Sequence, residues 1–318
     1  MIAPGARGLV TGGAGFIGPH LVQRLLDEEC SVVILDNFVT GRRAHLEAYR
    51  GNDGVTVVEC DLRDRDQTIA VVTGVRPDIV VHLAAHQVIP FCVANPAEAL
   101  RVNVLGTQHL LDAVARTDSC QRFLLASTAG VYAPSERPHT ESDPLAAGDV
   151  YGASKRLSEE LVAFAANQCP TVRFLVARFF NVYGPGETSA HLIPEILDAL
   201  AAGNVVLLGN LESRRDYVYV TDVVDALIRL GQYTGPRSVF NVGTGLGWSA
   251  MDIVHLLEII LKRHIDVEVD PGRVRRTDRP SLVADTTLAS VDLRWTAKIA
   301  LDEGLRRTLA MSSIRAAG

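Results

Sequence analysis

Tyr151 and Lys155 stand four residues apart in a segment with helical patterning, so their side chains lie on one face of that helix. A phenol with a pKa of about 10 is a weak base at neutral pH. A neighbouring ammonium stabilises the phenolate and lowers that pKa toward the working range. The chain has seven Tyr and three Lys, so chance rarely produces this spacing, and we favour a reactive pair over a surface Tyr–Lys pair.

Two hydroxyl side chains, Ser127 and Thr128, close the apolar run that begins at Arg122. Ligands of doubly wound sheets bind at the carboxyl ends of the strands, where a hydroxyl can hold or relay a substrate proton. Alone, this dipeptide is typical of an ordinary turn. Together with Tyr151 and Lys155, it is predicted to complete a catalytic group.

A glycine-rich loop follows the first apolar run, where residues 11–18 are TGGAGFIG. The spacing satisfies G-x-G-x-x-G at 13, 15 and 18 and G-x-x-G-x-x-G at 12, 15 and 18. Glycines permit a tight turn and close approach of backbone to a pyrophosphate, and the following helix N-terminus offers free N–H groups. A simple glycine-rich turn is the alternative, but the strand-loop-helix context predicts dinucleotide binding.

Asp36 ends the second apolar run, 24 residues after Gly12. A carboxylate there accepts both ribose hydroxyls of NAD and repels the extra phosphate of NADP. An ordinary aspartate in a turn is the alternative. Position and residue type favour NAD.

The elements that must position these residues alternate in the first half of the chain. Apolar strands separated by amphipathic helices predict an α/β fold, a doubly wound parallel sheet with a smaller C-terminal substrate-binding lobe. We expect residues 1–182 to form a Rossmann domain, with 216–242 returning to it, and 183–215 and 243–318 to form the lobe. Strands are predicted at 8–11, 32–36, 55–59, 79–83, 122–127 and 174–179, helices near 16–29, 64–73, 97–117, 150–168, 190–202, 221–232, 249–263 and 299–311, and loops at 183–188, 209–217 and 270–280.

Composition excludes several classes of protein. The net charge of −6 and pI near 5.9 lack the basic footprint of a nucleic-acid binder. No apolar run reaches the roughly 18–20 residues of a membrane span, and the N-terminal residues lack a signal-peptide pattern. Five widely spaced Cys without a C-x-x-C motif predict a reduced, cytoplasmic protein. No metal site is expected, because His82 and His86 have no third ligand.

The sequence resembles the extended short-chain dehydrogenase/reductase family, in its nucleotide-sugar epimerase/dehydratase branch. The resemblance covers nearly the whole chain. Its marks, in order, are TGGAGFIG (11–18), Asp36-Asn37, Asp61-Leu62, HLAA (82–85), Asn103 in VNVLGT, Ser127-Thr128, Tyr151-x-x-x-Lys155, RFFNVYGP (178–185), RRDYVYV (214–220) and NVGTG (241–245).

The resemblance implies roles for individual residues. Thr128, Tyr151 and Lys155 would be catalytic, and Lys155 would also hold the nicotinamide ribose. NAD would be bound by Gly12, Gly15, Phe16, Ile17, Gly18, Asp36, Asn37, Thr40, Gly41, Asp61, Leu62, Leu83, Ala84, Ala85, Gln87, Asn103, Ser127, Tyr151, Lys155 and Phe180. A UDP- or dTDP-linked sugar would be bound by Thr128, Tyr151, Asn181, His191, Leu192, Arg215, Arg275 and Asp278.

The resemblance also narrows the reaction. Dehydratases of this branch place Asp-Glu after the catalytic Thr, and decarboxylating relatives place a Glu two positions after it. Here those positions are Ala129 and Gly130, which cannot move a proton. What remains is epimerisation at sugar carbon 4, by transient oxidation and return of the hydride to the opposite face.

Other interpretations stay open at this point. A nucleotide-sugar 4-ketoreductase that consumes external NAD(P)H is the main alternative, and a non-catalytic dinucleotide sensor is a third. The loop at 86–92 is more apolar than is usual in the family, which permits a deoxy- or otherwise modified sugar. As in relatives, a homodimer is expected through the helices near 97–117 and 153–167, with the alternative that their apolar residues only cover the sheet. Those residues are Leu100, Leu110, Leu111, Leu157, Leu161 and Phe164.

Overall fold

The computed structural model describes residues 4–274, 279–311 and 314. The chain divides into two compact units. Unit 1 comprises Met1–Tyr132, Pro144–Arg178 and Val224–Phe240, and unit 2 comprises Ala133–Asp143, Phe179–Val223 and Asn241–Gly318. These units differ from the predicted domain ranges at 133–143, 179–182, 216–223 and 241–242, which fall in unit 2. The first of these segments lies there because the His139 backbone N–H donates to Val283 O, at 2.8 Å.

Unit 1 is built on a seven-stranded sheet within the described residues, with strand order β10-β6-β5-β4-β1-β2-β3. The pairs β1–β2, β2–β3, β1–β4 and β4–β5 are parallel. The central strands are buried on both faces, as their continuous apolar runs predict, whereas β3 at the edge is half exposed. The strands are β1 (Arg7–Thr11), β2 (Ser31–Asp36), β3 (Val55–Glu59), β4 (Ile79–His82), β5 (Arg122–Thr128), β6 (Arg173–Phe179) and β10 (Val239–Val242).

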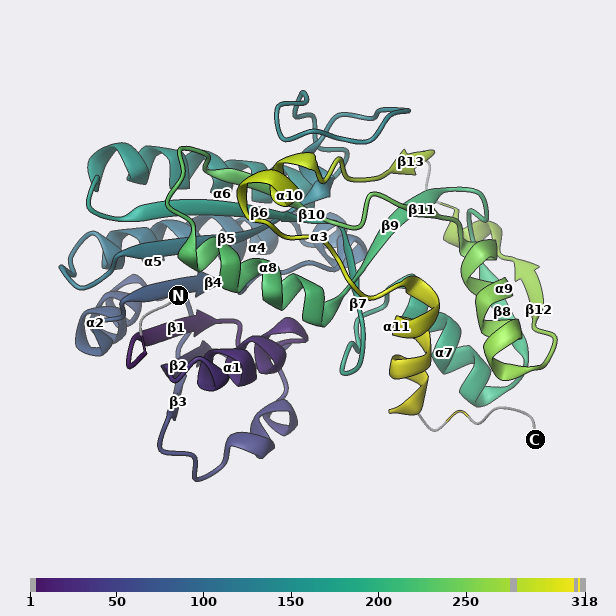
Figure 1. Cartoon of the computed structure of the whole chain (residues 1–318), viewed down its shortest axis with the longest axis horizontal. Coiled ribbons are helices and arrows are strands. Elements are labelled where there is room, and N and C mark those ends of the chain that lie inside the picture. The colour runs from purple at the N-terminus through teal and green to yellow at the C-terminus, as the bar shows by residue number, and fades with distance from the viewer. Residues whose placement is uncertain (1–3, 275–278, 312–313, 315–318) are drawn as a thin grey trace. The chain divides into compact units, whose positions relative to one another are not determined.

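Helices cover both faces of this sheet, which confirms the predicted doubly wound fold (Figure 1). On one face α2 (Arg65–Val75), α5 (Gly106–Val114) and α6 (Val150–Gln168) pack side by side. On the other face α1 (Ile17–Asp27) and α8 (Val220–Gln232) are joined by an ion pair between Arg24 and Asp225 at 3.4 Å.

The helical segment predicted near 97–117 is not uniform. It begins with α4 (Pro96–Leu100), passes through the π-helical turn η2 (Arg101–Leu105) and continues as α5. The buried Asn103 lies in the middle of the π turn. Such turns are single insertions that redirect a side chain and are frequent at functional sites. A short helix, α3 (Ile89–Ala94), precedes them and was not predicted from sequence.

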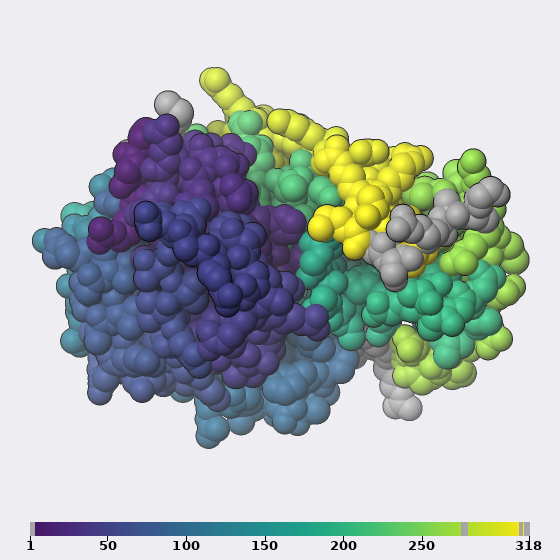
Figure 2. All heavy atoms as spheres, turned by 90° about the horizontal axis from the view of Figure 1, so that it is seen from below, coloured from purple at the N-terminus to yellow at the C-terminus, as the bar shows by residue number. Residues whose placement is uncertain are grey.

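Unit 2 contains two small sheets within the described residues. One joins β7 (Asn181–Tyr183), β9 (Arg214–Tyr219), β11 (Gly247–Trp248) and β13 (Ser281–Leu282), and the other pairs β8 (Val205–Leu208) with β12 (Asp266–Val269). The C-terminal helix α11 lies beside the segment that carries β7 (Figures 1 and 2), where Tyr183 Oη donates to Leu301 O at 3.3 Å. The helices that lie wholly in unit 2, among the described residues, are α7 (Leu192–Ala202), α9 (Ala250–Leu261), α10 (Thr287–Asp292) and α11 (Leu301–Ala310). The 3₁₀ turns of the described residues are η1 (Arg43–Tyr49), η3 (Ala129–Val131) and η4 (Pro271–Arg273).

The prediction of a loop at 209–217 is wrong for residues 214–217, which belong to β9, whereas residues 209–213 lie outside the helices and strands. The reason is the fully buried Asp216, whose carboxylate organises three backbone segments. It accepts hydrogen bonds from the backbone N–H groups of Thr244, Gly245 and Ala284 at 2.8, 2.8 and 3.2 Å, and from Thr244 Oγ1 at 2.6 Å. From the sequence, an acidic residue in an arginine-rich stretch suggests a loop. In the structure Asp216 lies on β9, the central strand of the four-stranded sheet of unit 2.

None of the helices in the described part of the chain is long and apolar enough to cross a membrane.

Replacing Asp216 with alanine should destabilise the protein by about 3 kcal/mol or more, because it leaves one buried and two partly buried backbone donors without their acceptor. Urea unfolding followed by circular dichroism measures this loss. The matched control is Asp198→Ala on the exposed face of α7, which should change stability by no more than about 0.5 kcal/mol. Equal stability of the two variants would contradict the assigned role of Asp216.

Candidate active site

The predicted catalytic residues come together in unit 1. Thr128 ends β5, and Tyr151 and Lys155 lie in the first two turns of α6. Asp149 caps this helix, since its Oδ1 accepts from the Gly152 backbone N–H at 2.8 Å. The Thr128 side chain lies close enough to Tyr151 to lower the pKa of its phenol. The cap fixes the start of the helix that carries the phenol.

Burial controls the electrostatics of this group. It raises the pKa of Tyr151 above its ordinary value, and the nearby Thr128 hydroxyl acts in the opposite direction. Lys155 is 1% exposed. Burial lowers its pKa to about 8, while the charge of Glu159 opposes that shift. The ammonium therefore holds its proton at neutral pH and loses it only slightly above.

Behind α6 lies a buried polar network that the sequence analysis missed. Glu159 accepts a hydrogen bond from Ser127 Oγ at 2.5 Å and is gripped by both arms of the Arg178 guanidinium, at 3.0 and 2.7 Å. Arg178 Nη1 also donates to Tyr132 Oη at 3.0 Å. All four side chains are buried. The signal was present in the sequence, since Glu159 follows Lys155 by four residues on the same helix face.

The Asn103 side chain clamps the loop after β4 to helix α6. Its Oδ1 accepts from the backbone N–H of His86 at 2.8 Å, and its Nδ2 donates to His86 O and Ser154 Oγ, both at 2.9 Å. Ser158 Oγ donates to Asn103 O at 2.8 Å. Ser154 and Ser158 flank Lys155 on α6, so the clamp holds the reactive helix in place.

The loop after β1 has the backbone geometry that a dinucleotide needs. Gly12 has a φ of +69°, and a Cβ there would lie 2.6 Å from Ala84 N. A Cβ on Gly18 would lie 2.2 Å from Gly13 O, so α1 packs directly on the loop. At Gly15 a Cβ would contact only Gly12 O, at 3.1 Å. Phe16, the N-cap of α1, makes no side-chain cap bond, and Ile17 begins the helix. This is a backbone cradle that side chains would fill, and it fits a pyrophosphate.

The carboxylate of Asp36 is held in place at the end of β2. Oδ2 accepts from Ala14 N at 2.9 Å and Oδ1 from Phe38 N at 2.8 Å, which leaves further lone pairs for a ribose. A Cβ on Gly41 would lie 2.7 Å from Oδ1, so only glycine fits there. Asn37 Nδ2 donates to Asp61 Oδ2 at 3.0 Å. The ends of β2 and β3 thus bring three predicted cofactor residues together.

The remaining cofactor candidates of unit 1 lie near these strand ends. Leu83 N donates to Thr11 O at 3.1 Å, which places Leu83, Ala84 and Ala85 directly after β4. Leu62 is buried, whereas Thr40 and Gln87 are exposed. Asp61 also binds Arg63, and this side-chain bond is the largest cause of its lowered pKa.

Thr128 and Tyr151, which are also substrate candidates, lie in unit 1, whereas Phe180 and the remaining substrate candidates belong to unit 2. Phe180 is buried, and its backbone N–H donates to Val242 O at 3.1 Å, while Asn181 begins β7. Arg215 lies on β9 and donates to Arg279 O at 2.8 Å. His191 is the N-cap of α7, directly before Leu192. Arg275 and Asp278 lie outside the described residues.

The sequence did not predict the contact that His191, one of the substrate candidates, makes with Glu187. The Nδ1 atom of His191 pairs with the carboxylate of Glu187, whose side chain is only 3% exposed. Burial raises the pKa of Glu187. The pairing limits the ways in which His191 can meet a ligand.

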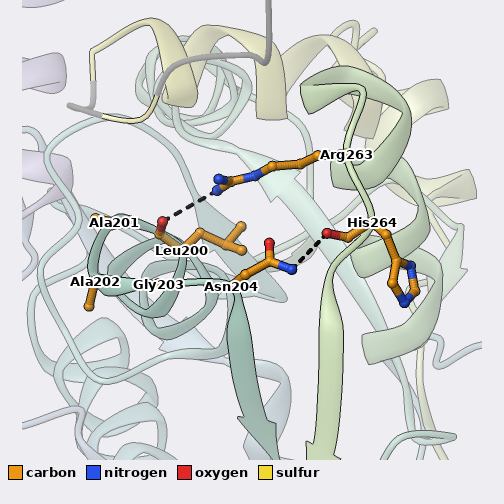
Figure 3. A pocket seen from close by; sticks show the side chains of 7 residues that line it. All are labelled: Leu200, Ala201, Ala202, Gly203, Asn204, Arg263 and His264. Carbon is orange, nitrogen blue, oxygen red and sulfur yellow. Dashed lines mark hydrogen bonds between the residues drawn. The ribbon is translucent and has the colours of Figure 1, made fainter.

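No group of residues suited to a metal ion occurs in the described part of the chain. His82 is instead a buried link, which contacts the hydroxyls of Thr11 at 2.7 Å and Thr107 at 2.9 Å. An open hollow in unit 2 is lined by none of the predicted site residues (Figure 3). There Arg263 donates to Leu200 O at 3.3 Å and caps the end of α7, which is a structural role.

Comparison with known proteins agrees with this geometry. A family model described as the NAD dependent epimerase/dehydratase family matches residues 8–243. The chain is 34% identical over 309 residues to a UDP-glucose 4-epimerase of Mycolicibacterium smegmatis, covering 95% of this chain and 97% of that protein. It is 31% identical over 312 residues to UDP-glucuronic acid decarboxylase 6 of Arabidopsis thaliana, covering 93% and 86%.

The solved structure of a UDP-glucose 4-epimerase from Thermotoga maritima with UDP-glucose is similar over the whole fold. The TM-score is 0.88 at 30% identity, covering 96% of this chain and 98% of that chain. The match of the family model spans the glycine loop, the Tyr151–Lys155 pair and the strand ends between them. The chain therefore belongs to the NAD dependent epimerase/dehydratase family and is an NAD-dependent enzyme of it.

Proposed function

We propose that this enzyme is a nucleotide-sugar 4-epimerase, which oxidises sugar carbon 4 transiently and returns the hydride to the opposite face. The observation that carries the proposal is the turn η3 after Thr128. Its Ala129 and Gly130 carry no carboxyl group. A Cβ on Gly152 of α6 would lie 2.6 Å from Gly130 O, so the turn packs backbone to backbone against the reactive helix. The turn thus lacks the carboxylates that the resemblance places after the catalytic Thr in relatives that remove water or CO₂ from the sugar.

The chain's own residues supply the proton chemistry. The phenolate of Tyr151 removes the proton of the 4-hydroxyl, and the Thr128 hydroxyl hydrogen-bonds the same oxygen. The Lys155 ammonium stabilises the phenolate. NAD supplies the hydride acceptor and donor when it is bound. The glycine loop and Asp36 would hold the pyrophosphate and the adenine ribose, respectively.

We propose further that the nucleotide carries a diphosphate bound by residues of unit 2. A guanidinium such as that of Arg215 matches the planar geometry of phosphate oxygens, and Asn181 and His191 add polar contacts. Arg275 and Asp278 complete the proposed set. The names of the similar epimerases and decarboxylases favour a UDP-linked sugar.

The product identifies the reaction. The purified enzyme, given UDP- and dTDP-sugars without added reductant, should yield a product of unchanged mass that separates from the substrate as its 4-epimer. A product that has lost water or CO₂ would assign the protein to another branch of the family. A product that appears only when NADH or NADPH is consumed would make the enzyme a 4-ketoreductase.

We also propose a cytoplasmic location. All five cysteines are free thiols, and four of them are buried. This is the state expected in a reducing compartment.

Tyr151→Phe should reduce turnover by about a hundred-fold or more, because it removes the base and leaves its ring in place. NAD binding and the thermal midpoint should remain near those of the parent protein. Steady-state kinetics, together with the NAD content of the purified variant, measure both effects. Unreduced turnover would show that the base is elsewhere.

Turnover should decline above about pH 8. The pKa of Lys155 is lowered to about 8, and the charged, protonated form is the one that stabilises the phenolate, so activity is lost as the pH rises through this value. A pH–rate profile measures the decline. In Lys155→Arg the guanidinium stays charged, so the residual activity of this variant should not show it.

A homodimer is the assembly we propose, through the outer surface of α3, α4, η2 and α6. Leu110 and Leu111 belong to the core of unit 1. These two residues therefore pack against the sheet and are not available for a dimer contact. Leu100, Leu105, Leu157 and Phe164 are instead 38%, 51%, 40% and 66% exposed on adjoining elements. A surface of this kind indicates an interaction site.

Phe164→Glu should convert the dimer to a monomer, because a buried unpaired charge is costly at an interface. Light scattering measures the mass. Ile259→Glu on α9 is the matched control, since Ile259 is equally exposed but lies in unit 2. A monomeric parent protein would rule out the dimer.

A further inference from the structure

The buried carboxylate of Glu159 lies one helical turn beyond Lys155 on α6. Residues four apart on a helix lie on the same face, so the ammonium and the carboxylate face the same side of the helix. Lys155 is 1% and Glu159 8% exposed. At such depth a charge interacts strongly with its neighbours, because water screens it little.

The contacts of Glu159 fix it from two strands. Ser127 Oγ at the end of β5 donates to Oε1 at 2.5 Å. The guanidinium of Arg178 on β6 donates to both carboxylate oxygens, with Nε to Oε1 at 3.0 Å and Nη2 to Oε2 at 2.7 Å. The guanidinium carbon also lies 4.8 Å from the centre of the Tyr132 ring. A bidentate pair of this kind leaves the carboxylate little freedom to move.

The strand residues that hold Glu159 adjoin the reactive group. Ser127 directly precedes Thr128, whose side chain lies close enough to Tyr151 to lower the pKa of its phenol. One carboxylate therefore joins the end of β5 to the face of α6 that carries Lys155.

We propose that Glu159, fixed by Ser127 and Arg178, is a positioning residue that keeps the buried Lys155 side chain charged and in register with Tyr151 and Thr128. The inference rests on the proposed roles of Tyr151 and Lys155. Glu159 itself touches neither substrate nor cofactor in this scheme and acts through the lysine. It supplies the negative charge that offsets the desolvation of the ammonium.

The other charged and titratable groups around the pair are consistent with this role. On β4, the buried His82 has its pKa lowered to about 3 by burial, with the charge of Lys155 acting in the same direction, so it stays neutral. On α6, burial raises the pKa of the Tyr151 phenol, and while it is protonated this group adds no negative charge near Lys155. Arg178 on β6 partly neutralises Glu159, but the charge that acts on Lys155 is that of Glu159. Glu159 is thus the source of the favourable field.

The chain offers a direct test, because it contains three lysines and the other two, Lys262 and Lys298, are exposed. Protein labelled with ¹³C at lysine Cε gives three signals, assigned with Lys262→Arg and Lys298→Arg, and no substrate is needed. In Glu159→Gln, which keeps the shape of the side chain but removes its charge, the pKa of Lys155 should be lower than in the parent protein by about one pH unit or more.

The matched control is Glu160→Gln, on the same helix but half exposed and paired with Arg156 at the surface. It should leave the Lys155 titration unchanged. Glu159→Gln leaves the Arg178 charge buried and unpaired, which can prevent folding. The double variant Glu159→Gln with Arg178→Met removes both charges and should fold. Its Lys155 pKa should also lie below that of the parent protein.

An unshifted Lys155 titration in either folded variant overturns the proposal. In the pH–rate profile, the alkaline decline of Glu159→Gln should move to lower pH together with the NMR titration, whereas a merely structural defect lowers turnover equally at every pH. If Lys155 titrates as expected but no nucleotide sugar is epimerised by the parent protein, the proposed function fails and the control of the lysine charge stands.

Discussion

The cost of burying an ammonium beside a phenol governs this site. In the proposed mechanism Lys155 is charged so that it stabilises the Tyr151 phenolate, yet it is buried, and burial favours its neutral form. The fold resolves this conflict by adding a second charge, Glu159, one turn along the same helix. That carboxylate needs partners of its own, which β5 and β6 supply through Ser127 and Arg178. Three elements of unit 1 are thus organised around one charge.

Close packing of backbone against backbone at three glycines is the second constraint on this site. Gly12 packs against the backbone after β4, Gly18 against Gly13, and Gly152 against Gly130. Each is a place where a Cβ would displace backbone rather than a flexible side chain. The first two bring the loop after β1 close enough for its N–H groups to meet a pyrophosphate. The third lets α6 pack directly against the turn after Thr128. The residues of that turn, Ala129 and Gly130, carry no proton-transfer group.

The sequence predicted most of unit 1 because its signals are local. Apolar runs such as Val32–Asp36 mark buried strands, and glycines and the Tyr151–Lys155 spacing mark the site. Unit 2 was harder, since the pairing of β7 and β9 joins Asn181 to Tyr217 across 36 residues, with helix α7 and strand β8 between them. Asp216 was assigned to a loop because it lies in a stretch rich in Gly and Arg. Its three backbone partners, at Thr244, Gly245 and Ala284, become visible only in the folded chain.

The network around Glu159 was missed for a similar reason. The i, i+4 spacing to Lys155 is visible in the sequence, but an acid–base pair at that spacing usually means an exposed ion pair, as Arg156 and Glu160 show on an exposed part of α6. What distinguishes Glu159 is its burial and its contact with Arg178, 19 residues away. Long-range contacts of this kind decide whether a charge belongs to the surface or to the site.

The fate of the hydrogen on sugar carbon 4 tests the account most directly. A nucleotide sugar carrying deuterium at that carbon, incubated with the enzyme in ordinary water without added coenzyme, should give the 4-epimer with the deuterium still on carbon 4. This is the result expected when the hydride leaves and returns within one active site. Loss of the label to water, or its accumulation in free reduced coenzyme, would contradict the account.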